Sequence, residues 1–106
     1  ILEVKTKQST ELGEYGIDNS SLTTYKYIAK EYMLPMLVFF VDYNPTVKEL
    51  RYTSLSNLLV AIEFNNKRYP YVISNDQMNI TMFNKHSTKL IRSLTEEEYN
   101  SIVELL

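Results

Sequence analysis

The chain opens with the stretch ILEVKTKQ, residues 1–8, and this stretch decides the predicted fold. Apolar and charged residues alternate along it with the two-residue period of a β-strand. One face would carry Leu2, Val4 and Thr6, and the other Glu3, Lys5 and Lys7. Such a strand can pack its apolar side on a helix and present Glu3 and Lys5 to a cleft. A carboxylate beside a cation is what a metal-dependent phosphodiesterase needs, although an alternating Glu/Lys strand is more often a solvated face.

Length and composition favour one globular domain of ordinary chemistry. The chain has 106 residues, of which 44% are hydrophobic and 23% charged, as in ordinary globular proteins. It has no cysteine and one histidine, which excludes thiolate sites and argues against multi-histidine zinc sites. Metal chemistry through Asp and Glu stays open. The net charge of −2 argues against bulk electrostatic binding of nucleic acid, but it does not exclude a nuclease with an acidic metal site.

The sequence has no feature that predicts a membrane or secretory destination. The longest apolar run, residues 36–41, is far shorter than a membrane span of about 18 residues or more. The first residues are charged and polar, unlike a signal peptide. We therefore expect a cytoplasmic protein with no membrane partner. Because the chain starts with Ile1 inside a strand, we also expect it to be a fragment of a larger domain.

The rest of the chain predicts an α/β or α+β fold with a central mixed sheet flanked by helices. Residues 9–18 contain both glycines and predict a loop, and residues 21–33 have the period of an amphipathic helix. The run at 36–42 does not alternate, which predicts a strand buried on both faces. Further strands are expected at 49–53, 71–73 and 79–83, turns at 44–45 and 65–68, and a short helix after 54–57. Thr95 and Glu98 form a capping box that starts the last helix.

The order of these elements resembles a known nuclease architecture. A strand with Glu3-x-Lys5, a loop, an amphipathic helix and a buried strand opening with Pro35 resemble the second half of the PD-(D/E)XK nuclease-like core, which is restriction-endonuclease-like. The stretches LPMLVFFVD at 34–42 and ELRYTSL at 49–55 also resemble bacterial nuclease-like domains of unknown function in that superfamily. The resemblance covers roughly residues 1–62 and rests on arrangement more than on specific motifs.

The resemblance implies a function and a set of site residues. Glu3 would be a metal ligand, Lys5 the catalytic lysine, and Val4 would offer its backbone carbonyl to the metal. The implied cofactor is Mg²⁺ and the implied substrate is DNA. The aspartate that precedes this strand in the superfamily would lie upstream of Ile1. Asp42 could replace it only if its strand runs beside the opening strand and their C-terminal ends coincide.

Other residues allow a second interpretation. Lys7, Lys26 and Lys30 could form a basic edge for nucleic acid together with Lys5, or Lys26 and Lys30 could be the solvated face of a helix. Tyrosines at apolar-periodic positions, such as Tyr25, are more often core than base-stacking platforms. The alternative function is a non-catalytic protein-interaction module or an inactive nuclease relative. The expected partners beyond DNA are a second copy in a homodimer, or a missing N-terminal segment.

Overall fold

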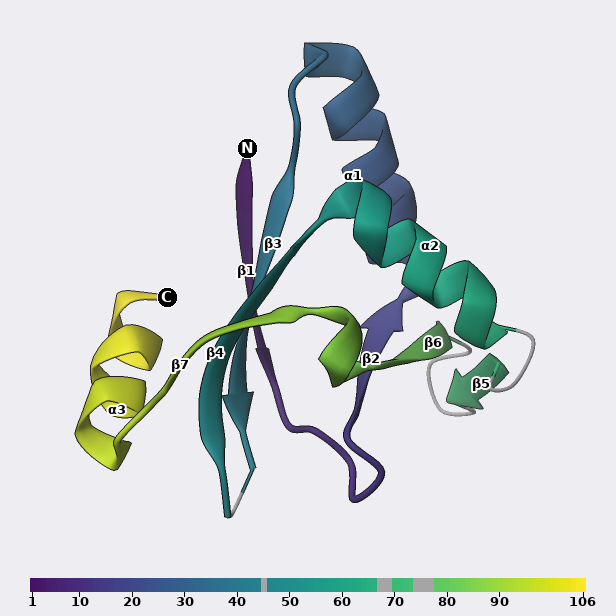
Figure 1. Ribbon diagram of the computed structural model, residues 1–106. Coiled ribbons are helices and arrows are strands. Elements are labelled where there is room, and N and C mark those ends of the chain that lie inside the picture. Colours follow the sequence, from purple (N-terminus) through teal and green to yellow (C-terminus); the bar gives the residue numbers. More distant parts are fainter. Residues whose placement is uncertain (45, 67–69, 74–77) are drawn as a thin grey trace.

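The computed structural model describes residues 1–44, 46–66, 70–73 and 78–106. Within them the chain is α+β, with a mixed four-stranded sheet, a smaller sheet and α-helices on both sides of the larger sheet (Figure 1). This confirms the predicted fold class.

The larger sheet has the strand order β1-β3-β4-β7. Its strands are β1 (Leu2–Lys7), β3 (Leu37–Tyr43), β4 (Lys48–Ser54) and β7 (Lys89–Ser93). β1 pairs with β3 in parallel, and the other two pairings are antiparallel. The sheet is therefore mixed, as the sequence predicted, although β7 was not among the expected strands.

The smaller sheet has the order β2-β6-β5 and contains one strand that the sequence did not predict. Its strands are β2 (Glu14–Asp18), β6 (Met78–Asn84) and β5 (Pro70–Ile73). The prediction of a loop throughout 9–18 was wrong for its second half. Gly16 lies in the middle of β2. Glycine is favoured at this position because a Cβ would come within 2.9 Å of Ile80 Cγ2 and Met82 Sδ. A glycine in a strand can thus mark close packing as well as a turn.

The second and third α-helices begin at side-chain caps that the sequence predicted, whereas the first begins at Asn19, two residues before the predicted start, with no side-chain capping bond from Asp18. The helices are α1 (Asn19–Tyr32), α2 (Leu55–Asn66), the 3₁₀ turn η1 (Lys85–Ser87) and α3 (Glu96–Leu105). α1 ends at Met33 in a left-handed conformation with φ of 52°, two residues before Pro35. The Ser54 Oγ accepts a hydrogen bond of 3.2 Å from the Asn57 backbone N–H at the start of α2. α3 has the predicted capping box. Pro45 and part of the predicted turn at 65–68 lie outside the described residues.

The core lies between one face of the larger sheet and the layer formed by α1, α2, β2 and β6. We call this face the inner face and the opposite one the outer face. The buried cluster takes one or more apolar side chains from each of these elements: Tyr15, Ile17, Leu22, Tyr25, Met36, Val38, Phe40, Leu55, Leu58, Ile62 and Phe83. α3 lies on the other side of the sheet, along the outer face (Figure 1).

The orientation of β1 differs from the arrangement that the sequence suggested. Its register places Lys5 beside Phe40, a core residue, so Glu3, Lys5 and Lys7 belong to the inner face. Leu2 and Val4 belong to the outer face and are 67% and 38% exposed. The apolar side of β1 therefore faces away from α1 and α2. Among the described residues, no helix is long and apolar enough to cross a membrane.

Candidate functional site

The predicted pair, Glu3 and Lys5, lies on the half-buried inner face of β1, at the edge of the larger sheet. The two residues are two positions apart on one strand, so their Cα atoms are separated by about 7 Å. Val4 lies between them, and its side chain points to the outer face. The structure thus keeps this pair together on one surface, as the alternation along β1 predicted.

Tyr25 of α1 covers this part of β1. The Lys5 Nζ lies 5.7 Å from the centroid of the Tyr25 ring, within the range of a cation–π contact. Tyr25 is only 4% exposed, and among the described residues its hydroxyl has no hydrogen-bond partner. Leaving a buried hydroxyl unpaired costs about 1–3 kcal/mol. This hydroxyl therefore calls for a water molecule or a bound polar group next to it.

Asp42 does not join Glu3, although both predicted conditions are met, since β3 runs beside β1 and the two strands end together. β1 and β3 are neighbours and parallel, but the register pairs Lys7 with Asp42 and Glu3 with Val38. Four residues of strand separate the levels of Glu3 and Asp42, or about 13 Å. Asp42 therefore cannot act as the missing carboxylate beside Glu3. Within the described part of the chain, no three acidic or histidine side chains are grouped closely enough to hold a metal ion.

Asp42 instead belongs to a buried network of polar side chains that joins the two sheets. It is fully buried, and its Oδ1 accepts a hydrogen bond of 3.0 Å from the Ser9 backbone N–H. Its Oδ2 accepts one of 3.0 Å from the Tyr15 hydroxyl, and the Lys85 Nζ lies 3.6 Å away. Tyr15 belongs to β2 and Lys85 follows β6, so the carboxylate of one sheet holds two groups of the other.

Glu49 of β4 extends the network, since its register partner across the sheet is Asp42. The Lys85 Nζ donates to Glu49 Oε1 over 2.9 Å, and the Arg51 Nε donates to the same oxygen over 3.2 Å. Burial acts to raise the pKa of Glu49, but these hydrogen bonds outweigh it and lower the pKa below its usual value. Burial, followed by the Asp42 charge, raises the pKa of the Tyr15 hydroxyl.

The network is balanced and internally satisfied. Its two carboxylates face two cations, and Arg51 also donates to the carbonyl oxygens of Lys85 and Thr88. Such a closed arrangement holds elements together and leaves little free charge for a ligand. No sequence motif predicted this network, although the sequence holds one sign of it. Asp42 and Glu49 lie near the two ends of the predicted turn at 44–45, where a hairpin would place them opposite each other.

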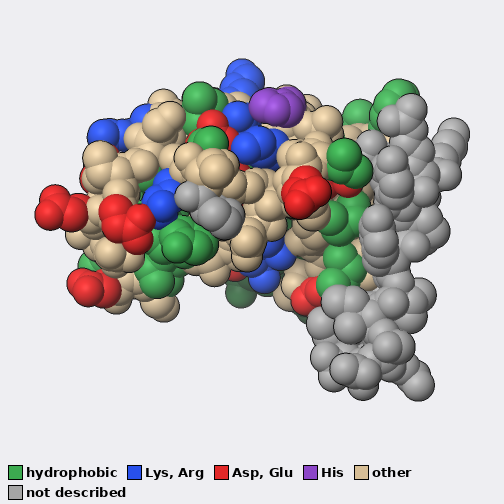
Figure 2. Space-filling view, turned by 90° about the horizontal axis from the view of Figure 1, so that it is seen from below, with side chains coloured by type: hydrophobic (Ala, Val, Ile, Leu, Met, Phe, Trp, Pro, Cys, Tyr) green, Lys and Arg blue, Asp and Glu red, His purple; other side chains and the backbone are tan. Residues whose placement is uncertain are grey.

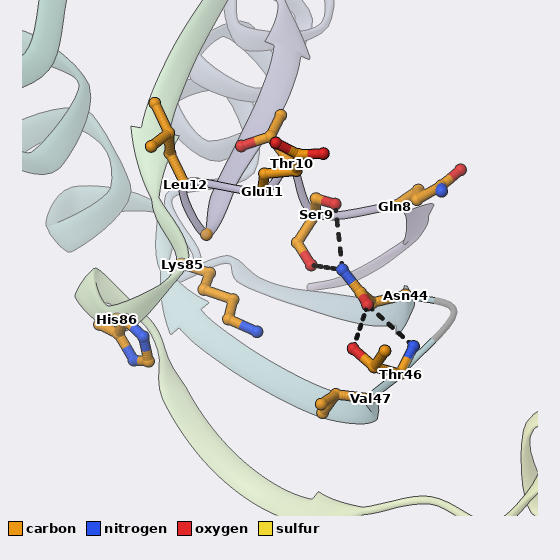
Figure 3. Close-up of a pocket in the computed structure, with 11 residues that line it drawn as sticks. Gln8, Ser9, Thr10, Glu11, Leu12, Asn44, Thr46, Val47, Lys85 and His86 are labelled. Carbon is orange, nitrogen blue, oxygen red and sulfur yellow. Dashed lines mark hydrogen bonds between the residues drawn. The ribbon is translucent and has the colours of Figure 1, made fainter.

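A hollow of about 670 Å³ opens above this network. It is bounded by the β1–β2 loop, the β3–β4 turn and η1 (Figure 3). Figure 3 shows the Lys85 side chain reaching from η1 towards the β3–β4 turn, where Asn44 donates to the Ser9 carbonyl and hydroxyl oxygens. His86 is exposed at the edge of the hollow.

The other predicted lysines lie in different places. Lys7 is partly buried, and its burial, with the neighbouring charge of Lys5, lowers its pKa against the opposing influence of Asp18. Lys26 lines a pocket with Leu59 and Glu63 of α2, away from the larger sheet. Lys30 is exposed in the last turn of α1. Lys5 and Lys7 thus share one surface, while Lys26 and Glu63 share another.

Comparison with protein-family models, with curated proteins and with solved structures gave no match. The resemblance to PD-(D/E)XK nucleases therefore stays a prediction, and function has to be argued from the geometry of this chain.

Proposed function

We propose that this chain carries part of a metal-dependent phosphodiesterase centre that acts on DNA. Glu3 would bind the divalent cation, Mg²⁺ in the simplest case, together with the backbone carbonyl of Val4. Lys5 would position the attacking water or stabilise the charge that develops on the phosphate. Lys7 would contact the DNA backbone from the same strand.

The observation that carries this proposal is the buried Tyr25 hydroxyl beside Lys5. The Lys5 ammonium lies over the Tyr25 ring, whose hydroxyl has no partner among the described residues, and Glu3 shares the half-buried face of β1 with Lys5. A buried hydroxyl is nearly always paired with a protein group or an ordered water molecule. A metal-bound water or a phosphate oxygen would supply the partner that Tyr25 lacks.

Glu3 and one backbone carbonyl provide few ligands for a Mg²⁺ site, which uses one or two carboxylates with waters and substrate phosphates. A second carboxylate would complete the site. Among the described residues β1 pairs only with β3, so its other edge offers backbone groups to a further strand. The proposal places the second carboxylate on a strand paired there.

Paramagnetic broadening by Mn²⁺ tests this assignment, because NMR detects binding too weak for calorimetry. We expect amide signals of β1 and the ring signals of Tyr25 to broaden on Mn²⁺ addition and to recover with EDTA. Glu3→Gln should abolish the effect there. Glu31→Gln, a change of the same kind in an exposed part of α1, should leave it intact. Broadening confined to other acidic residues would rule out a metal site on β1.

A second function, a protein-interaction module, is favoured by the outer face of the larger sheet. Leu2, Val4 and Tyr43 are exposed there, and Phe39 stacks on Tyr52 with centroids 5.9 Å apart. Apolar side chains that stay exposed on neighbouring strands can mark a protein–protein interaction site. This proposal and the nuclease proposal use opposite faces of β1, so both functions are compatible in one chain.

A further inference from the structure

We propose that the outer face of the larger sheet binds a second copy of this chain, through α3. This inference rests on the proposal that the outer face is an interaction surface, and it names the partner. It starts from the way in which α3 covers that face.

α3 covers only one end of the outer face. Its Tyr99 ring packs on Tyr43, with centroids 4.8 Å apart, at the end where β3 finishes. Glu96 pairs with Lys48 over 2.8 Å at the same end. Figure 1 shows the N-terminal half of β1 rising beyond the last turn of α3, on the side that no helix covers. α3 is about 15 Å long and β3 about 23 Å, so one helix leaves part of the strands open.

The part of the outer face that α3 leaves uncovered is apolar. The strand register shows which side chains form it. Leu2 is paired with Leu37, and Val4 lies beside Phe39, which in turn pairs with Tyr52. Leu2 is 67% exposed and Val4 is 38% exposed. Leu2, Val4, Leu37, Phe39 and Tyr52 therefore form an apolar patch that continues from the surface covered by α3 towards the start of β1.

α3 has an apolar stripe that its own sheet only partly covers. Val103 is 37% exposed, and Leu106, the residue that caps the end of α3, is 62% exposed. Each copy thus offers an incompletely covered helix and an incompletely covered sheet face. In a two-fold dimer the same patch serves both copies, so each α3 would pack on the open face of the other. A different partner would fill the sheet face but need not cover α3.

Charged side chains at the edge of the patch also favour a second copy of this chain as the partner. Lys89 pairs with Tyr52 across the sheet, so its side chain lies at the rim of the open part. Within the described residues, Lys89, Glu97 and Glu104 form no ion pair, whereas Glu96 and Glu98 of α3 do. Figure 2, seen from below, shows acidic side chains gathered on the α3 side of the molecule. Packing α3 on the partner's open face would bring acidic side chains towards Lys89.

Analytical ultracentrifugation of the 106-residue chain tests the inference. We expect a monomer–dimer equilibrium whose dissociation constant rises about tenfold or more in Leu2→Lys, since a leucine's burial is lost and a charge enters an apolar contact. Leu106→Lys should act in the same direction. Leu12→Lys is the matched control, because Leu12 is 74% exposed in the β1–β2 loop, outside the patch. Lys89→Glu should weaken the dimer more at low salt than at high salt.

The possible outcomes separate this inference from the interaction proposal. Circular dichroism spectra like that of the unchanged chain would show that each variant is folded. A chain that stays monomeric at all concentrations overturns the homodimer. If that monomer binds an apolar fluorescent dye and Leu2→Lys abolishes the binding, the face is open and the interaction proposal survives with another partner. A monomer that binds no dye overturns both. A dimer unaffected by Leu2→Lys and Leu106→Lys overturns the assignment of this surface.

Discussion

Replacing Lys85 with methionine would measure how far charge holds the buried network together. The Lys85 Nζ lies 2.9 Å from Glu49 Oε1 and 3.6 Å from Asp42 Oδ2. Methionine keeps most of the apolar stem and removes the ammonium group. Glu49 would keep Arg51, and Asp42 would keep its hydrogen bonds from Tyr15 and Ser9. Two neighbouring buried carboxylates would then share one cation.

The expected loss is large for a single substitution. Removing one partner of a buried ion pair costs about 3–5 kcal/mol, because a charge is left without compensation. Since the other partners stay in place, we expect Lys85→Met to lower the free energy of unfolding by about 2–4 kcal/mol near neutral pH. Urea unfolding followed by circular dichroism gives this quantity directly.

The loss should depend on pH in a defined direction. In the folded chain the pKa of Glu49 is lowered, so its ionised form contributes stability above the unfolded pKa of about 4.3. That contribution is lost as the pH falls through the folded value. Without Lys85 the folded pKa rises, and protonation then relieves the repulsion in the variant. The difference in stability between the two chains should therefore shrink from neutral pH to about pH 4.

A matched control and a clear contrary result complete this test. Lys30→Met removes an exposed lysine of α1 that has no ion pair in the described part of the chain and lies outside the proposed dimer surface, and it should change the stability by at most about 0.5 kcal/mol. A loss in Lys85→Met that is the same at both pH values would refute this reasoning, because it would show that the effect of Lys85 does not depend on the ionisation of Glu49.

Two further substitutions test the junction of the two sheets. Gly16→Ala would place a Cβ 2.9 Å from Ile80 Cγ2 and Met82 Sδ, and we expect a loss of about 1–3 kcal/mol in thermal unfolding. Unchanged stability would mean that the Ile80 and Met82 side chains move aside at little cost. Tyr15→Phe removes the hydrogen bond to Asp42 and should cost about 1.5–3 kcal/mol. Because the folded pKa of Tyr15 is raised, the unchanged chain should lose stability as the pH rises through about 10, the usual value for tyrosine. That part of the pH dependence should be absent in Tyr15→Phe, and its persistence there would assign it to another group.

Neighbouring residues alone determined much of the secondary structure. The period of α1, the stop at Pro35 and the capping box at Thr95 act within a few residues, so the sequence predicted them correctly. The alternation along β1 also fixed which side chains share a face, and it kept Glu3 and Lys5 together. Such features need no knowledge of distant residues.

Only the tertiary structure decided which elements pack on each face of β1 and which strand pairs with β2. The same alternation fits either orientation of β1, and the chain turned Leu2 and Val4 outwards because α1 and α2 pack on the other side of β3. β2 depends on pairing with β6, more than sixty residues away, so a polar glycine-containing stretch gave no local sign of it.

The buried network shows the same division. The turn at 44–45 predicts that Asp42 and Glu49 lie near each other, but Lys85 reaches them only because the smaller sheet packs against the larger one. Register likewise separates Asp42 from Glu3, which the order of elements could not reveal. Local periodicity sets the elements and their faces, whereas register and layer packing, which join residues far apart in the chain, decide which charges meet.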